Sequence, residues 1–200
     1  MAKVYDVRLE IGRKDALIIV DVQRDFCPSG TLAVQKGDTV VPILNEYIRF
    51  FTKARALIYA TRDWHPPNHI SFRERGGKWP AHCVQDTPGA EFQPSLKLPA
   101  GANVISKAAD PDAEAYSGFD RTKLREELES KGVTRVFVGG LATDYCVKNT
   151  VLDALKLGFE TVLLEDAIQG VDLEPGDSLK AIKEMAESGA KKATLKDFCS

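Results

Sequence analysis

The stretch that decides the fold is Val136-Phe137-Val138-Gly139-Gly140-Leu141-Ala142-Thr143-Asp144-Tyr145-Cys146. Its first part is apolar and rich in β-branched residues, which predicts a buried strand that two glycines end. Thr143 or Asp144 can then cap a helix over residues 145–156, where apolar residues recur at helical spacing. Cys146 falls in the first turn, where free N–H groups and the helix dipole favour a thiolate. The pattern predicts a candidate nucleophile, and the alternative is a buried structural cysteine.

The composition is that of an ordinary soluble protein, with 44% apolar and 28% charged residues in a chain of 200, and it predicts one domain over residues 1–200. The net charge of −2 argues against a nucleic-acid partner. No apolar run approaches the roughly 20 residues that cross a bilayer. The N-terminus also lacks the apolar core of a signal peptide, so we expect a cytoplasmic protein without a membrane partner. No CxxC pair or zinc-finger spacing occurs, which predicts free thiols at Cys27, Cys83, Cys146 and Cys199.

Predicted strands and helices alternate along the chain. The predicted strands cover residues 16–22, 56–61, 103–106, the run from Val136, and 160–164. The predicted helices cover residues 39–53, 121–131, 145–156 and 177–188, and residues 193–198 add packing or an edge strand. This order predicts right-handed parallel crossovers, and so an α/β three-layer sandwich: an open, mostly parallel sheet with helices on both faces.

Four reactive side chains follow four predicted strands. Asp21 ends the first strand and Asp63 follows the second, while Lys107 follows the third and Cys146 the fourth. Ligands of such sheets bind outside the carboxyl ends of the strands. Lys107 can hold a thiolate electrostatically, and Asp21 can accept the thiol proton and later deliver it to a leaving amine. Taken alone, Asp21 is equally a loop-capping residue and Lys107 an exposed lysine.

Residues 62–102 show little regular pattern and contain all three histidines and both tryptophans. An irregular segment of this length in a compact domain is either functional or a sign that the assignment of strands and helices is wrong. Asp63 and His65 project to the same side of an extended chain, and His82 can add a third ligand. One carboxylate and two imidazoles suit a catalytic divalent metal, with zinc expected first and iron or manganese also accepted. His69 is a possible fourth ligand, and the alternative is that the Asp-x-His pair only stabilises a turn.

Six motifs resemble those of nicotinamidases, also called pyrazinamidases, which belong to the isochorismatase-like hydrolases. They occur in the family's order and span residues 17 to about 170. The motifs are residues 18–26 (IIVDVQRDF), 61–65 (TRDWH), 79–83 (WPAHC), 87–90 (TPGA), 115–119 (AYSGF) and 140–147 (GLATDYCV).

The resemblance implies hydrolysis of nicotinamide, and also of pyrazinamide, through a Cys thioester in NAD salvage. The implied catalytic triad is Asp21, Lys107 and Cys146. The implied metal ligands are Asp63, His65 and His82. Family members with a fourth histidine ligand space it further from His65 than His69 is here, which leaves the role of His69 open.

The resemblance also implies a cis peptide bond between Leu141 and Ala142. The Ala142 and Cys146 N–H groups would then form an oxyanion hole, the kind of site that stabilises tetrahedral intermediates. The implied substrate-binding residues are Phe26, Trp79, Tyr116 and Leu141. The oligomeric state stays open, a homodimer included.

Two other functions compete with this one. The first is another amidohydrolase of the same superfamily, acting on an N-carbamoyl or ureido amide; the metal trio argues against it, because members of that type generally lack the metal. The second is a non-catalytic, metal-binding interaction protein with the same fold. An intact Asp21, Lys107 and Cys146 argues against the second.

Overall fold

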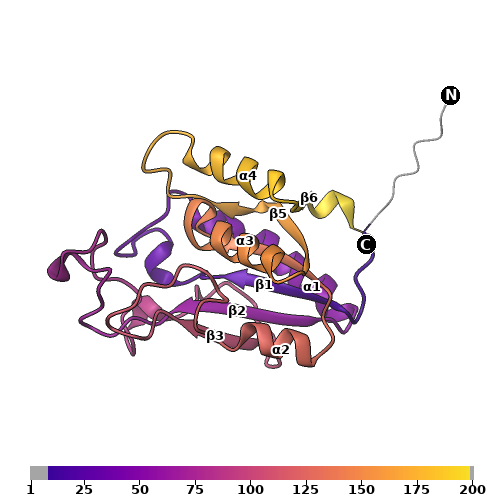
Figure 1. Ribbon diagram of the computed structural model, residues 1–200, viewed down its shortest axis with the longest axis horizontal. Helices are drawn as coiled ribbons and strands as arrows, with labels where there is room; N and C mark the ends of the chain where they lie inside the picture. Colours follow the sequence, from indigo (N-terminus) through magenta and orange to yellow (C-terminus); the bar gives the residue numbers. More distant parts are fainter. Residues whose placement is uncertain (1–8, 199–200) are drawn as a thin grey trace.

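The computed structural model describes residues 9–198, which are built around a six-stranded sheet of parallel strands (Figure 1). The strand order across the sheet is β3-β2-β1-β4-β5-β6. The strands are β1 (Asp15–Val20), β2 (Leu57–Asp63), β3 (Asn103–Lys107), β4 (Arg135–Leu141), β5 (Glu160–Gln169) and β6 (Lys191–Ala193). The predicted open parallel sheet is confirmed. The edge strand β6 overlaps the predicted residues 193–198 only at Ala193, and Leu195–Asp197 form a 3₁₀ turn instead.

Helices cover both faces of the sheet, as predicted. They are α1 (Val40–Lys53), α2 (Leu124–Ser130), α3 (Lys148–Lys156) and α4 (Asp177–Glu187). Helix α1 covers one face, and the other three cover the opposite face. Strand β1 is buried from end to end, which explains its continuous apolar sequence. Within residues 9–198, none of the helices combines the length and apolarity that a membrane crossing requires.

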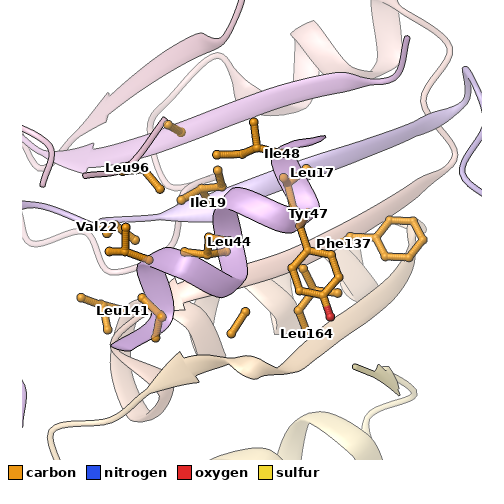
Figure 2. Packing of buried hydrophobic residues seen from close by; sticks show 14 of the residues in the cluster. Leu17, Ile19, Val22, Leu44, Tyr47, Ile48, Leu96, Phe137, Leu141 and Leu164 are labelled. Atoms are coloured by element: carbon orange, nitrogen blue, oxygen red, sulfur yellow. The ribbon is translucent and has the colours of Figure 1, made fainter. Parts of the chain in front are cut away.

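The core beneath α1 shows how one strand serves two layers. Leu17 and Ile19 of β1 belong to the cluster that contains Leu44 and Tyr47 of α1 (Figure 2), while Ile18 of β1 belongs to the cluster on the other face. Successive side chains of a strand point to opposite faces, so one apolar run supplies both cores. This double burial anchors β1 and therefore fixes the position of the residue that follows it.

The prediction for the start of the Cys146 helix was partly wrong. Residues Thr143–Val147 form a π-helical turn that leads into α3, and neither Thr143 nor Asp144 caps it. The Asp144 carboxylate instead accepts the backbone N–H groups of Val171 and Asp172, both at 2.9 Å. Asp144 thus binds backbone groups distant in sequence instead of capping its own helix. The sequence alone does not reveal this contact.

Other element boundaries also differ from the prediction. Strand β5 continues to Gln169, beyond the predicted end at residue 164, because its acidic residues find partners. Asp166 accepts hydrogen bonds from the Tyr47 hydroxyl and the Leu195 N–H, and Glu165 pairs with Lys192. Helix α2 starts at Leu124 rather than 121, and α1 starts at Val40 rather than 39.

The irregular segment between β2 and β3 lies beyond the carboxyl ends of the strands (Figure 1). Short backbone pairs hold it together: the His65 N–H donates to Cys83 at 3.0 Å, and the Arg73 N–H donates to Trp79 at 2.8 Å. The predicted functional segment therefore folds as a compact cap over the sheet edge that carries the reactive side chains.

The second glycine of the deciding stretch is required by its surroundings. Gly140 has a φ of +125°, and a Cβ at this position would lie 2.1 Å from the Val20 carbonyl oxygen. We expect Gly140→Ala to lower the free energy of unfolding by about 3 kcal/mol or more, through backbone strain and overlap. Gly101→Ala is the control, because a Cβ there meets no atom within 4 Å. Equal urea midpoints for the two variants would contradict this account.

Candidate active site

The four predicted strand-end residues meet in one buried group. Asp21 follows β1, Asp63 ends β2, Lys107 ends β3, and Cys146 follows β4. The Lys107 ammonium lies 2.9 Å from Asp21 Oδ2 and 3.5 Å from Cys146 Sγ, and it also donates to Asp63 Oδ1. Asp63 and Lys107 are register partners in the sheet, so their proximity follows directly from strand pairing. The structure therefore brings together the predicted triad and one predicted metal ligand.

Lys107 carries a positive charge with no solvent contact. Burial by itself would lower its pKa, but the carboxylates of Asp21 and Asp63 raise that pKa well above its usual value. The Ala115 carbonyl accepts a further hydrogen bond from the ammonium at 3.2 Å. A buried ion is tolerated only when it is paired and hydrogen-bonded, and Lys107 meets both conditions.

Asp21 is placed to accept a proton. Burial raises its pKa, and the nearby charge of Lys107 opposes the rise. Its Oδ1 accepts the Thr61 hydroxyl at 2.6 Å. Its Oδ2 lies within ion-pair distance of Lys107 but makes no well-directed hydrogen bond. That oxygen thus keeps a free acceptor position, and a carboxylate oxygen of Asp21 lies within 4.8 Å of Cys146 Sγ.

The environment of Cys146 corrects the prediction of a stabilised thiolate. Burial raises the pKa of the Cys146 thiol well above its usual value, although the charge of Lys107 opposes the shift. Desolvation of the anion is the largest cause, and it acts against the helix-terminus effect that the sequence pattern indicated. The resting side chain is therefore a thiol that needs a base.

The backbone before Cys146 has the predicted cis peptide bond between Leu141 and Ala142. The Ala142 carbonyl accepts the N–H groups of Tyr145 and Val147, at 3.1 and 3.0 Å. Within residues 9–198 the Ala142 N–H itself donates to no protein acceptor. Ala142 and Cys146 both line the cavity described below.

The three predicted metal ligands converge beside this group. Donor atoms of Asp63, His65 and His82 all lie within 4.8 Å of one another. His65 Nδ1 bonds the His82 carbonyl at 3.0 Å, and His82 Nδ1 bonds the Pro80 carbonyl at 2.8 Å. Because a carbonyl can only accept, each Nδ1 carries the hydrogen and each Nε2 keeps a free lone pair. Such outer bonds orient metal-binding histidines in proteins.

The protonation states suit a cation. Burial lowers the pKa of His65 to about 4 and also lowers that of His82. Burial alone would raise the pKa of Asp63, but the charge of Lys107 holds it below its usual range. Two neutral imidazoles and a carboxylate are the forms that bind a divalent metal. The donor set therefore fits zinc, iron or manganese.

His69 lies against His65, with ring centroids 4.3 Å apart, but both of its nitrogens have protein partners. Nδ1 is 2.7 Å from the Ser71 hydroxyl, and Nε2 is 3.2 Å from the Ala113 carbonyl. His69 thus differs from His65 and His82, because its Nε2 already has a protein partner and theirs keep a free lone pair.

A small, mostly apolar cavity opens beside Cys146. It is lined by Phe26, Leu32, Asp63, Trp79, His82, Tyr116, Ala142, Tyr145, Cys146 and Val171. Three of the four predicted substrate-binding residues are present. Leu141 is not, because its side chain is buried in the core beneath α1 (Figure 2).

Sequence reasoning missed three lining residues, Leu32, Tyr145 and Val171. Tyr145 adjoins Cys146 and could have been found from the motif. Leu32 and Val171 lie in loops far apart in sequence, and no local signal marks them. The Asp144 carboxylate fixes the loop that contains Val171.

A buried glutamine was also missed. The Gln23 amide accepts from the Asp63 N–H at 2.8 Å and donates to the Asp63 carbonyl at 2.8 Å and the Ala90 carbonyl at 3.0 Å. Gln23 thereby ties the metal-ligand segment to the end of β1. Asp25 does similar work nearby, since its carboxylate accepts the Cys83 N–H at 2.7 Å.

The model of the isochorismatase domain matches residues 15–197. The chain belongs to the isochorismatase family.

Cys199, one of the four predicted free thiols, lies outside the described residues, whereas the other three cysteines are free.

The chain is similar to a nicotinamidase of Escherichia coli (strain K12), which is 39% identical over 92% of this chain and 96% of its own length. A pyrazinamidase of Pyrococcus horikoshii, solved in complex with zinc, is 56% identical; the match covers 91% of this chain and 99% of that one, with a TM-score of 0.88. PnC1 from L. infantum, solved in complex with nicotinate, is 35% identical, covers 96% and 99% of the two chains, and has a TM-score of 0.87.

The three bonds of Gln23 give a stability prediction. Gln23→Leu leaves backbone groups of Asp63 and Ala90 unpaired in the interior, so we expect the free energy of unfolding to fall by about 2 kcal/mol or more. Gln93→Leu is the matched control, because the Gln93 side chain bonds only the exposed Ser95. Chemical denaturation measures both, and a Gln23→Leu variant as stable as Gln93→Leu would refute the structural role.

Proposed function

We propose that this chain is a nicotinamidase that hydrolyses nicotinamide to nicotinate and ammonia through a Cys146 thioester, with pyrazinamide as a second substrate, as a step of NAD salvage. The observation that carries the proposal is the buried cluster in which Cys146 lies close to Asp21 and Lys107. This cluster adjoins a cavity lined by Cys146 and by two members of the metal trio, Asp63 and His82. The nicotinamidase and pyrazinamidase relatives support the choice of substrate.

The cavity walls support a neutral aromatic substrate. Aromatic side chains of Phe26, Trp79, Tyr116 and Tyr145 line it, and no lysine or arginine of the described chain is among the lining residues. The Trp79 Nε1–H and the Tyr116 hydroxyl bond each other at 3.1 Å, so the polar atoms of this wall have partners. A pyridine ring is matched by such a wall, whereas a carboxylate or ureido group would lose its hydrogen-bond partners there.

Asp63, His65 and His82 would hold a divalent ion, and zinc is our first expectation. When bound, the ion would supply a Lewis acid that takes the pyridine nitrogen, directly or through water, and so orients the ring. The remaining roles fall to the chain itself, with the Phe26, Trp79 and Tyr116 rings excluding water from the face of the substrate.

In the first half of the reaction Asp21 removes the thiol proton of Cys146, and the thiolate forms a bond to the carboxamide carbon. Lys107 stabilises the thiolate as it forms. The Ala142 and Cys146 N–H groups donate to the oxyanion, and loss of one such donor typically costs about 10²–10³ in rate. Asp21 then returns the proton to the amide nitrogen, the C–N bond breaks, and ammonia leaves a thioester.

In the second half a water molecule replaces ammonia. Asp21 removes a proton from this water, the resulting hydroxide attacks the thioester carbon, and the same two N–H groups hold the oxyanion. The C–S bond breaks, the sulfur recovers its proton from Asp21, and nicotinic acid leaves and releases its proton to the solvent as nicotinate. A buried base with a raised pKa can both take and return a proton in this way.

The direct test is ammonia release by the purified, metal-loaded protein. We expect turnover of nicotinamide and of pyrazinamide, and much slower turnover of an N-carbamoyl amide or of ureidoacrylate. Faster turnover of either of the latter would support the rival amidohydrolase. No ammonia from any of the four would leave the interaction-protein hypothesis and would overturn ours.

Removing the nucleophile gives the first functional prediction. Cys146→Ala should lower kcat by at least about 10³-fold, because no thioester can form, while nicotinamide still binds. Cys27→Ala is the control, since this buried thiol lies outside the cavity lining. Steady-state kinetics and titration calorimetry measure the two quantities. Full activity of Cys146→Ala would exclude the covalent route.

Removing a proposed metal ligand gives the second functional prediction. His82→Ala leaves Asp63 and His65 as the only remaining protein donors of the trio, so we expect less than one metal per chain after gel filtration and much weaker nicotinamide binding. Elemental analysis of the purified variant provides the measurement. An unchanged metal content would contradict the assignment of His82.

A further inference from the structure

His69 is fully buried and has no part in the mechanism above. It belongs to the segment that carries the proposed metal ligands, and it contacts a second segment of the site, residues 113–116, through Ala113. The latter residues belong to no helix or strand, so their position depends on side-chain contacts.

The hydrogen bonds fix the direction of each contact at the His69 ring. The Ser71 N–H donates to Nδ1 at 3.2 Å, and an N–H group can only donate, so Nδ1 carries no proton. The hydrogen of the ring is therefore on Nε2, which donates it to the Ala113 carbonyl at 3.2 Å. Both nitrogens are committed in this arrangement, although His69, His65 and Glu114 have donor atoms close enough for a cation.

The segment that His69 holds supports two parts of the site. The Ala115 carbonyl accepts the Lys107 ammonium, and the Tyr116 hydroxyl bonds Trp79 on the cavity wall. Two further bonds attach the same region: Ile70 N–H to the Pro111 carbonyl at 2.8 Å, and Arg121 to the Glu114 carbonyl at 2.6 Å. These bonds do not involve His69, so they persist in a His69 variant and favour a folded protein.

We propose that His69 is a positioning residue: its Nε2–H bond to Ala113 sets the 113–116 segment so that the Ala115 carbonyl aims Lys107 at Cys146 and Asp21. The proposal rests on the proposed function for the reaction concerned. It assigns His69 no role as a metal ligand. A displacement of about 1 Å at a reacting group can cost about 10²-fold in rate. Loss of the single His69–Ala113 hydrogen bond can therefore have a measurable effect on kcat.

The test compares His69→Gln with His69→Leu in the metal-loaded protein. Gln keeps an N–H donor for Ala113, whereas Leu fills similar space without one. We expect His69→Leu to lower kcat by about 10–100-fold with little change in KM, and His69→Gln to recover most of kcat. Both variants should keep one metal per chain by elemental analysis, in contrast to His82→Ala.

A second readout is independent of the substrate. The rate of Cys146 alkylation by iodoacetamide, followed by peptide mass spectrometry, reports the alignment of Lys107 with the thiol. We expect His69→Leu to change this rate and His69→Gln to leave it near that of the native chain. A native chain that releases no ammonia from nicotinamide would remove the proposed function, and the alkylation rates would still test the positioning role.

Three results would overturn the proposal. Loss of metal from both variants would make His69 a ligand. Native kcat and alkylation rate in His69→Leu would show that the bond does not matter. Equal losses of kcat in both variants would show that the N–H donor to Ala113 is not what sustains the rate. If His69→Leu fails to fold, His69→Gln decides: one metal and near-native kcat support the proposal, and loss of either overturns it.

Discussion

The site depends on one buried cation, the Lys107 ammonium. It has no contact with water and is held by the carboxylates of Asp21 and Asp63. A lone charge in such a place would be prohibitively costly, so the three groups are stable only as a set. Parallel strands bring them together, because the strands all end at the same edge of the sheet. Cys146 joins the set from the fourth strand end, 3.5 Å from the ammonium.

The loops around this set are held by buried polar side chains rather than by secondary structure. Gln23 fixes the backbone of Asp63, Asp25 fixes that of Cys83, and Asp144 fixes that of Val171. Irregular segments form only isolated backbone pairs, so buried side chains satisfy many of the remaining backbone groups. The geometry of the site is therefore distributed over residues that never face the cavity.

Burial has opposite effects on the groups it encloses, and the proposed chemistry uses the difference. It raises the pKa of the Cys146 thiol and of Asp21, and it lowers the pKa of His65 and His82. The thiol then needs a base, the carboxylate is a better one, and the imidazoles are neutral and ready for a metal. The same burial thus prepares two different kinds of site side by side.

Much of the fold and of the candidate site could be predicted from the sequence. Apolar periodicity located five of the six strands and all four helices. The residues at the ends of four of these strands marked the site, because strand ends are local features that the sheet topology then brings together. The six motifs supplied the family, which the match over residues 15–197 confirms.

Only the tertiary structure decided the rest. It replaced the expected cap at Asp144 with a long-range contact, buried Leu141 in the core, and brought Leu32 and Val171 to the cavity. It also raised the pKa of Cys146, against the local indication of a thiolate. Sequence patterns describe a residue and its neighbours along the chain, whereas desolvation and loop contacts are set by residues distant in sequence, and only folding determines which those are.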